Sequence, residues 1–164
     1  MPCVCAQRKV CASMSTDHPT IHASAVLVGA RALLIQGPPG AGKSRLALAL
    51  LQAAETGALR FARLVADDRA LIEPVHGRLL VRPAPVLAGL IEVRGLGIRR
   101  VPYEPVAEVG TVVELSAGDA LRLPEAASRA TEIAGIRLPR LAVAAGVDPL
   151  PLLLAYLRTE DAIP

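Results

Sequence analysis

Aromatic side chains are scarce in this chain of 164 residues, since they make up only 2% of a composition that is 52% hydrophobic. The aromatic residues are Phe61, Tyr103 and Tyr156. Proteins that bind single-stranded nucleic acid without sequence preference stack the bases on aromatic platforms, so this composition argues against that class. The hydrophobic core must instead be built from aliphatic side chains.

Cysteines and long apolar runs are also few. Cys3, Cys5 and Cys11 lie near the N-terminus without the paired C-x-x-C spacing of a zinc site. No stretch reaches the roughly 18 apolar residues typical of a transmembrane helix, and no signal-peptide pattern precedes the cysteines. We therefore expect a cytoplasmic protein without disulfides or a membrane partner. Residues 1–19 are predicted to be a disordered leader and residues 20–160 a single domain, with Met14 as an alternative translation start.

Lysine is rare as well, although the formal net charge is +3. Of the 18 basic Lys and Arg residues, only Lys9 and Lys43 are lysines. The arginines are scattered along the chain, which favours a solvated mixed surface over a nucleic-acid-binding patch. Lys43 therefore calls for an explanation of its own.

A phosphate-binding motif provides that explanation. The run that fits G-x-x-x-x-G-K-S is Gly37-Pro38-Pro39-Gly40-Ala41-Gly42-Lys43-Ser44. Backbone N–H groups of such a loop face phosphate oxygens, the compact ammonium reaches the β- and γ-phosphates, and the serine hydroxyl can ligate Mg²⁺. The motif predicts ATP and Mg²⁺ as ligands. Guanine is disfavoured because no lysine follows Lys43 to form an N-K-x-D motif.

Apolar runs and turn residues predict an α/β fold with a mixed sheet. Gly29-Ala30 separates two strand-like runs, so we expect an antiparallel hairpin with a type II′ turn directly before the phosphate loop. P-loop proteins more often begin with a lone parallel strand. The other predicted strands are 61–66, 90–93, 110–115, 136–144 (interrupted by Pro139) and a second hairpin of 70–72 and 78–81 about His76-Gly77. Helices are predicted at 43–53, closed by Gly57, and at 149–158, with a loop or short helix over 117–130.

Two adjacent carboxylates, Asp67 and Asp68, end the predicted strand 61–66. A strand that follows the phosphate-loop helix is where a metal-binding aspartate is expected. Neighbouring strand residues point to opposite sides, so one carboxylate could serve the metal and the other the chemistry. A helix cap or a plain turn pair is the alternative.

Taken in order, these features resemble the HPr kinase/phosphorylase family, bacterial enzymes that act on a serine of the phosphocarrier protein HPr. His22 lies fifteen residues before Gly37, and the run LVADD ends at the aspartate pair. The run IEVRGLGI at 91–98 is close to the family's E-x-R-G-x-G signature. Arg140 falls where the family carries an arginine in a loop. The resemblance spans roughly residues 20–145.

The resemblance implies a role for each matched residue. Asp67 would be the base that deprotonates the target serine, with His22 supporting it. Lys43 would contact the β-phosphate and Arg140 the transferred phosphoryl group. The metal would be held by Ser44, Asp68 and Glu92. Arg94, Gly95 and Gly97 would form the signature loop. Each residue also has an ordinary alternative: a structural histidine, a cross-strand Glu92–Arg94 pair, or glycines that only shape a turn.

Some positions depart from the family pattern. The sequence around Arg140 reads LPRL instead of P-G-R-N, and the extra N-terminal domain of the long form is not found in this sequence. The chain resembles a short proteobacterial form, in which oligomer formation and phosphorylase activity are less well supported than ATP binding.

The predicted function is thus an ATP- and Mg²⁺-dependent serine kinase, with the phosphorylase reaction left open, acting on HPr or an HPr-like protein in phosphotransferase-system signalling. Homo-oligomer formation is left open. The alternatives are a small-metabolite kinase with the same phosphate site and a non-catalytic ATP sensor. Arg94, Arg99 and Arg100, with leucines of the last helix, are the candidate contacts for a protein partner.

Overall fold

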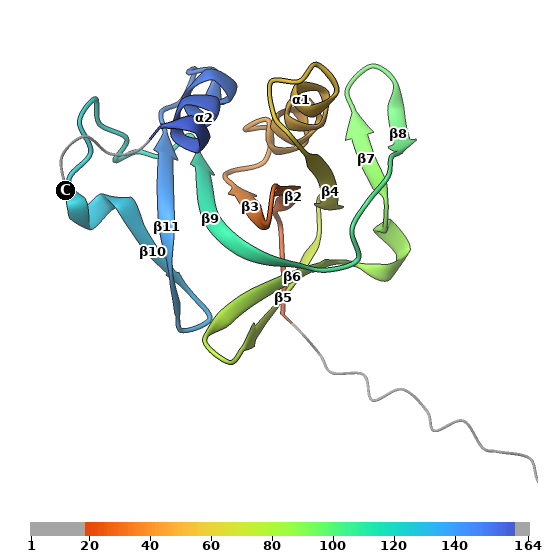
Figure 1. Ribbon diagram of the computed structural model, residues 1–164, viewed down its shortest axis with the longest axis horizontal. Coiled ribbons are helices and arrows are strands. Elements are labelled where there is room, and N and C mark those ends of the chain that lie inside the picture. Colours follow the sequence, from red (N-terminus) through yellow and green to blue (C-terminus); the bar gives the residue numbers. More distant parts are fainter. Residues whose placement is uncertain (1–18, 160–164) are drawn as a thin grey trace, which may run out of the picture.

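A computed structural model describes residues 19–159 as a mixed sheet with helices on one side and a second strand layer on the other (Figure 1). The leader predicted at residues 1–19 therefore lies almost wholly outside the described residues, and the single-domain boundary stays a prediction. No helix within residues 19–159 has the length and apolar character needed to cross a bilayer.

The structure contains eleven strands, two α-helices and two short 3-10 helices within these residues. In chain order they are β1 (Thr20–Ile21), β2 (Ser24–Val28), β3 (Arg31–Gln36), α1 (Lys43–Glu55), β4 (Ala62–Ala66), β5 (Ala70–Val75), β6 (Arg78–Pro83), η1 (Pro85–Leu87), β7 (Leu90–Val93), β8 (Gly97–Arg100), β9 (Ala107–Leu115), η2 (Ala126–Arg129), β10 (Ala130–Ile133), β11 (Ile136–Val143) and α2 (Pro149–Arg158).

The hairpin predicted before the phosphate loop is confirmed. β2 and β3 pair antiparallel, with Val28 opposite Arg31. Gly29 has a φ of 62°, whereas Ala30 is not among the non-glycine residues with positive φ. A positive φ at the first central residue alone is the pattern of a type II′ turn. The hairpin at His76-Gly77 is also confirmed, with positive φ at both residues.

The middle of the sheet brings four strand ends to one edge. The order is β4-β2-β3-β9, and β11 pairs with β9 on the side away from β3. β3, β9 and β11 are mutually parallel, and β4 runs in the same direction because β2 is antiparallel to both β3 and β4. The carboxyl ends of all four strands therefore meet at the edge where ligands bind in open α/β sheets.

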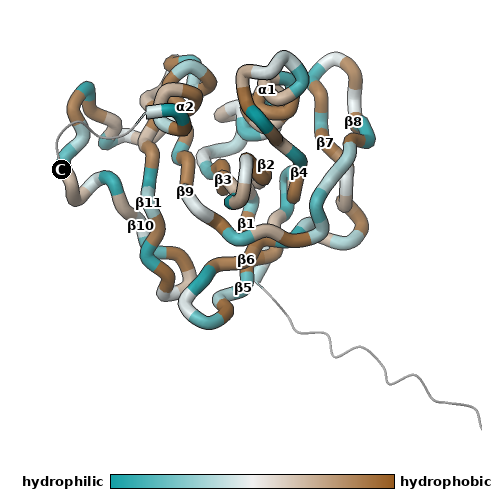
Figure 2. The backbone as a smooth tube through the Cα atoms, in the orientation of Figure 1, coloured by the Kyte–Doolittle hydropathy of each residue, from teal (hydrophilic) through white to brown (hydrophobic). Residues whose placement is uncertain are grey.

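Both faces of this sheet are buried, which explains why β3 is a continuous apolar run rather than an alternating one. Leu33 and Ile35 pack with Leu46 and Leu50 of α1 on the helical side. Leu34 instead packs toward the β5–β6 side in a separate aliphatic cluster. Figure 2 shows the hydrophobic residues concentrated along β2 and β3. The aliphatic core expected from the composition is confirmed.

The last helix matches its predicted bounds, but its leucine side chains are less exposed to solvent than expected. Leu153 is fully buried, and Leu150, Leu154 and Leu157 are partly buried against the helical-side cluster. Leu152 is the leucine of α2 with the most exposed side chain, at 40%. The helix is mainly part of the core rather than a leucine-rich docking face.

Several strands differ from the sequence prediction, and β5 and β9 are longer than predicted. Pro139 does not interrupt β11: residues 136–139 pair with β10, and residues 140–143 pair with β9. The proline, which has no N–H to donate, stands where the strand changes partners. The short strands β1, β8 and β10 were not predicted: β1 has two residues, β8 follows the glycine turn of the signature run, and β10 lies in a polar stretch.

Candidate active site

The phosphate loop has the backbone conformation that its glycines allow. Gly37, Gly40 and Gly42 have φ values of 148°, 79° and 94°. A Cβ added at Gly37 would lie 2.8 Å from the carbonyl oxygen of Leu115, so only glycine lets β9 approach this closely. The loop leads directly into α1, whose first N–H groups face the space above the loop.

Lys43 is held in place by the loop itself. Its side chain folds back so that Nζ donates to the carbonyl oxygens of Gly37 and Pro38, at 3.0 and 3.2 Å. The residue is buried, with 7% of its surface exposed. Both acceptors are neutral carbonyls, so the ammonium can turn to phosphate oxygens, which are stronger acceptors.

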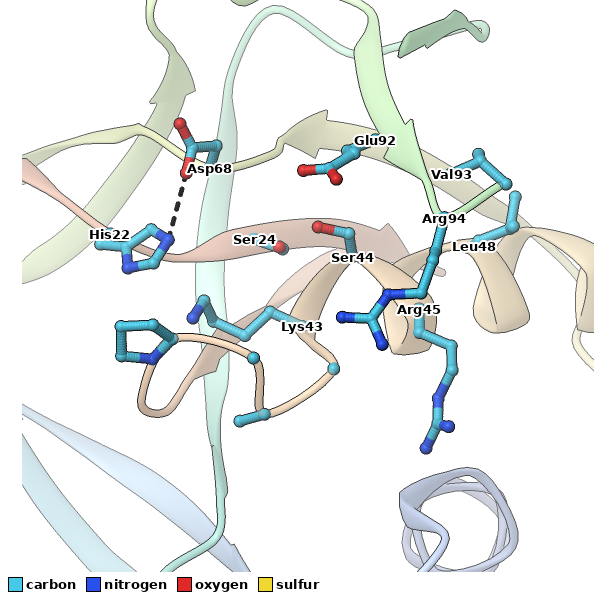
Figure 3. Close-up of a pocket in the computed structure, with 14 residues that line it drawn as sticks. His22, Ser24, Lys43, Ser44, Arg45, Leu48, Asp68, Glu92, Val93 and Arg94 are labelled. Atoms are coloured by element: carbon cyan, nitrogen blue, oxygen red, sulfur yellow. Dashed lines mark ion pairs between the residues drawn. The ribbon is translucent and has the colours of Figure 1, made fainter. Parts of the chain in front are cut away.

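A cavity of about 600 Å³ opens beside this loop (Figure 3). The predicted site residues that line the cavity come from four places: the segment just before β2, the phosphate loop with the start of α1, the turn after β4, and β7 with the turn that follows it. They are His22, Pro39, Gly40, Ala41, Gly42, Lys43, Ser44, Asp68, Glu92 and Arg94. Most of the site predicted from sequence is thus brought together, although the role of each residue stays a prediction.

The two aspartates have different surroundings. Asp67 is 4% exposed, and both its carboxylate oxygens are engaged: Oδ1 accepts from Ser24 Oγ at 2.5 Å and Oδ2 from the Glu92 backbone N–H at 3.1 Å. Asp68 has a side chain that is 63% exposed and lines the cavity. The expected separation of the two carboxylates is present, with Asp68 and not Asp67 in the cavity.

The backbone explains this separation. Asp68 has a φ of 66°, and the Arg69 N–H donates to the Asp67 carbonyl at 2.8 Å. A hydrogen bond across one residue with positive φ defines a classic γ-turn, which is rare and strained. Strain of this kind persists where the surrounding structure holds it and is common at functional sites.

His22 contacts a different aspartate from the one expected. The resemblance implied that His22 supports Asp67, but His22 Nε2 lies 3.1 Å from Asp68 Oδ1. The oxygens of Asp67 accept instead from the Ser24 hydroxyl and from the backbone N–H of Glu92 on β7. The histidine–aspartate pair of this site is therefore His22–Asp68 (Figure 3).

The signature run forms the β7–β8 hairpin. Glu92 lies opposite Ile98 and Val93 opposite Gly97, and the Leu96 N–H donates to the Val93 carbonyl across the turn. Gly95 and Gly97 have φ values of 86° and 78°, so they shape this turn. The bond from the Glu92 N–H to Asp67 attaches the hairpin to the end of β4.

The oxygen ligands suit a magnesium ion. The Ser44 hydroxyl and the Asp68 and Glu92 carboxylates line one cavity, and Figure 3 shows the Glu92 carboxylate directed toward Ser44. Among residues 19–159 no three His, Cys, Asp or Glu side chains are grouped closely enough to hold a metal alone. Mg²⁺ typically uses one or two carboxylates and takes its other ligands from waters and substrate phosphates, so the residues fit this ion.

Arg140 is not among the residues that line this cavity. Its side chain is 10% exposed, donates to Glu114 and Asp119 at 2.7 Å each, and contacts the Ser128 carbonyl. Hydrogen bonds to Asp119 and then Glu114 raise the pKa of Arg140, and the bond from Arg140 lowers the pKa of Asp119. The contact with the phosphoryl group expected from the resemblance is not supported, because the guanidinium is occupied by two carboxylates.

The comparison with known families agrees with this geometry. The family model described as "HPr Serine kinase C-terminal domain" matches residues 13–104, which is more than half of the chain. The chain belongs to this family. The resemblance found in the sequence motifs is thereby confirmed.

Curated relatives and a solved structure give the extent of the similarity. The chain is 42% identical over 82 residues to the HPr kinase/phosphorylase of Clostridium tetani, and 38% identical over 87 residues to that of Streptococcus thermophilus. These matches cover 50% and 52% of this chain but 25% and 26% of the relatives, so the chain spans about a quarter of their length. The fold is similar to the HPr(Ser) kinase/phosphatase structure from Coxiella burnetii, with a TM-score of 0.67 and 27% identity, covering 85% of this chain and 93% of that one.

Two residues of the candidate site were missed by the sequence reasoning. Ser24 is fully buried and donates to Asp67, but its position at the start of an apolar strand gives no sign of that contact. Arg45 lines the cavity and follows directly after the phosphate-loop serine. Its place in the first turn of α1 could have identified it, since this turn faces bound phosphates.

Proposed function

We propose that this chain is an ATP- and Mg²⁺-dependent serine kinase that acts on HPr or an HPr-like phosphocarrier protein. The observation that carries the proposal is the single cavity lined by the phosphate loop, the His22–Asp68 pair and the Glu92–Arg94 segment of the family signature. Family membership supports the substrate, since the relatives are named for HPr. The matched residues cover only about a quarter of the length of these relatives, so activity and partner are proposed here.

Lys43 and the loop N–H groups would bind the β- and γ-phosphates. Ser44 and Glu92 are the residues that would hold Mg²⁺, which when bound neutralises charge on the β- and γ-phosphate oxygens. Asp68, which the resemblance assigned to the metal, is left to take the substrate proton. Arg94 lines the same cavity and is the available guanidinium for the transferred group, a role the sequence had assigned to Arg140. Arginine suits this task because its planar fork matches phosphate oxygens.

The contacts favour Asp68, rather than Asp67, as the base. A base must reach the substrate proton, and Asp68 faces the cavity while both oxygens of Asp67 are occupied inside the protein. The serine hydroxyl would give its proton to Asp68 as its oxygen attacks the γ-phosphorus. The bond from this phosphorus to the β–γ bridging oxygen breaks, and ADP leaves. His22 would stabilise the carboxylate by donating Nε2–H.

The reverse phosphorylase reaction would use the same groups, with Asp68 as the acid that returns a proton to the serine oxygen. This part of the proposal is supported by the names of the curated relatives, HPr kinase/phosphorylase. Incubation of the phosphorylated carrier with inorganic phosphate, followed by mass spectrometry, tests it separately from the forward reaction.

The forward reaction is tested by incubating the chain with Mg²⁺, ATP and purified HPr, and by mapping phosphate by mass spectrometry. We expect phosphoserine on HPr, and none with a carrier in which the target serine is alanine. Lys43→Ala should reduce turnover by about 10²-fold or more, because it removes a charge that stabilises the transferred phosphate. Phosphorylation of a small metabolite with no phosphoserine on HPr would favour the small-metabolite kinase. ATP binding without any transfer would favour the sensor.

A further inference from the structure

The buried polar and charged residues among residues 19–159 are Ser24, Lys43, Asp67 and Thr111. Lys43 belongs to the phosphate loop, and the hydroxyls of Thr111 and Tyr156 share a hydrogen bond outside the cavity lining. Ser24 and Asp67 form a pair of their own, and the proposed reaction uses neither of them. Burying polar groups is costly unless they are hydrogen-bonded, so the partners of this pair indicate its role.

The pair connects three segments of the chain through one carboxylate. Ser24 Oγ donates to Asp67 Oδ1 at 2.5 Å, and the Glu92 backbone N–H donates to Asp67 Oδ2 at 3.1 Å. Ser24 starts β2, Asp67 directly follows β4, and Glu92 lies in β7. Within residues 19–159, β7 and β8 form a two-stranded sheet of their own, whereas β2 and β4 belong to the main sheet. The Asp67 carboxylate therefore links the separate β7–β8 hairpin to the main sheet.

This link fixes the orientation of β7 more strictly than apolar packing does. Ile91 is 1% exposed and packs in the helical-side cluster, which holds β7 against α1. Apolar packing is not directional, so it constrains the sliding and tilting of the strand less than its distance from α1. A hydrogen bond to a buried carboxylate requires both a distance and an angle. The bond to Asp67 therefore sets the position of the backbone at Glu92.

Glu92 is the residue whose position matters for the proposed chemistry. Its backbone N–H bonds to Asp67, while its side chain lines the cavity with the carboxylate directed toward Ser44 (Figure 3). The point of attachment of the hairpin and the proposed magnesium ligand are thus the same residue. Mg²⁺ demands near-ideal octahedral geometry, so it is sensitive to a small shift of a ligand. Loss of a hydrogen bond that orients a metal ligand typically costs about 10–100-fold in metal affinity or activity.

Ser24 completes this arrangement because it occupies the other oxygen of Asp67. Two donors from different strands hold the carboxylate plane, since rotation of the side chain would break at least one of the two bonds. We propose that Ser24 is a positioning residue: through Asp67 it holds the β7 backbone and thereby places the Glu92 carboxylate beside Ser44 for Mg²⁺. This role rests on the proposed function, in which Glu92 holds the metal.

Ser24→Ala removes the hydroxyl and leaves one oxygen of a buried carboxylate without its donor. At fixed ATP, the Mg²⁺ concentration for half-maximal phosphorylation of HPr should rise at least about tenfold, while the rate at saturating Mg²⁺ changes little. The matched control is Thr111→Val, which also takes a buried hydroxyl out of a hydrogen bond, but outside the cavity lining. It should keep the Mg²⁺ dependence of the wild type even if it lowers the melting temperature as much. Wild-type Mg²⁺ dependence in Ser24→Ala would overturn the positioning role.

Amide hydrogen exchange followed by NMR on the ligand-free protein gives a readout that needs no activity. In the wild type, the Glu92 amide should exchange more slowly than the amide of Gly95 in the turn, because it is bonded to Asp67. Ser24→Ala should accelerate exchange at Glu92 at least about tenfold, with no comparable change at Leu34 in β3, whereas Thr111→Val should not accelerate it. Exchange at Glu92 as fast as at Gly95 in the wild type would overturn the proposal even if Ser24→Ala does not fold.

The two experiments separate the positioning role from the proposed function. If the wild type phosphorylates HPr and Ser24→Ala has the same Mg²⁺ dependence, the positioning role fails and the kinase proposal stands. A wild type that is inactive at every Mg²⁺ concentration would overturn the kinase proposal and, with it, the metal role of Glu92. The exchange rates would then still show whether Ser24 holds the hairpin.

Discussion

Asp67 and Asp68 are neighbours in the chain, yet their carboxylates do different things. The γ-turn at Asp68 directs its side chain to the cavity, where it meets His22, while Asp67 bonds Ser24 and the Glu92 N–H inside the protein. One of the two is thus a structural acceptor that joins β2, β4 and β7. The other is free to meet a substrate. Because of this difference, mutations of the two residues should have distinguishable effects.

Asp67→Asn should destabilise the fold, and Asp68→Asn should mainly lower activity. An asparagine at 67 can keep its oxygen toward the Glu92 N–H and donate its NH₂ group to the Ser24 hydroxyl, but both bonds lose the carboxylate charge that strengthens them, which costs about 1–2 kcal/mol. An asparagine at exposed position 68 should change the free energy of unfolding by less than about 0.5 kcal/mol, and lower the rate of phosphoryl transfer about 10²-fold or more. Urea unfolding and single-turnover phosphorylation measure the two effects. A stable but inactive Asp67→Asn beside an active Asp68→Asn would return the base to Asp67, as the sequence predicted.

At the scale of structural elements, the conformation of the phosphate loop depends on the close contact between Gly37 and strand β9. Gly37 combines a φ of 148° with a Cβ position only 2.8 Å from the Leu115 carbonyl oxygen. Gly37→Ala should therefore displace the loop from β9, cost about 1–3 kcal/mol of stability, and weaken tripolyphosphate binding. The matched control is Gly118→Ala, where a Cβ meets no atom within 4 Å and φ is not positive. Equal melting temperatures for the two variants would contradict the close-approach argument.

Arg140 anchors the segment between β9 and β10 to the sheet, because it bonds Glu114 on β9, Asp119 and the Ser128 carbonyl. The bond from Arg140 lowers the pKa of Asp119, so the folded state favours the charged carboxylate. Its contribution to stability is present above the ordinary pKa of about 3.8 and is lost as pH falls through the lowered folded value.

Arg140→Met should therefore lower the melting temperature at pH 7, and its difference from the wild type should shrink as pH falls below about 4. Arg137→Met, at an exposed arginine of the same strand, is the control and should change little. Thermal unfolding followed by circular dichroism over this pH range measures both variants. A difference that stayed constant down to low pH would show that the carboxylate partners of Arg140 do not matter. The ATP affinity of Arg140→Met should remain close to that of the wild type.

Local sequence signals predicted the elements well where turn chemistry is decisive. The Gly29-Ala30 and His76-Gly77 turns, the phosphate loop and the bounds of α2 all follow from short-range patterns. Contacts between distant strands could not be predicted in this way. A γ-turn determines which of the two adjacent aspartates His22 contacts. The hydrogen bonds of Arg140 go to carboxylates that are 21 and 26 residues away in the sequence. Motif matching selected residues that mostly line one cavity, but it did not identify the side chains that each of them contacts.

At the scale of the whole molecule, the cavity of the candidate site lies beside the phosphate loop, and the β7–β8 hairpin stands beside α1 (Figure 1). The hairpin begins in the cavity at Glu92 and Arg94 and ends in a strand whose residues are all exposed. Leu96 and Ile98 are 62% and 63% exposed, next to Arg99 and Arg100. Exposed aliphatic and arginine side chains next to a candidate active site form a plausible contact surface for a protein substrate.

We therefore expect a folded HPr-like protein to be phosphorylated far more efficiently than a peptide that contains the same serine, because only the folded carrier can contact the hairpin. Arg99→Glu should raise the KM for the folded carrier several-fold, as a reversed charge at an interface rim does, and leave the KM for ATP and the rate with the peptide unchanged. Arg122→Glu, at an exposed arginine of the segment before η2, is the control with the same charge change. Steady-state phosphorylation at fixed ionic strength measures all three substrates. An equal KM for the folded carrier in the two variants would exclude the hairpin as the docking surface, while equal efficiency on peptide and carrier would show that the serine and its neighbours suffice.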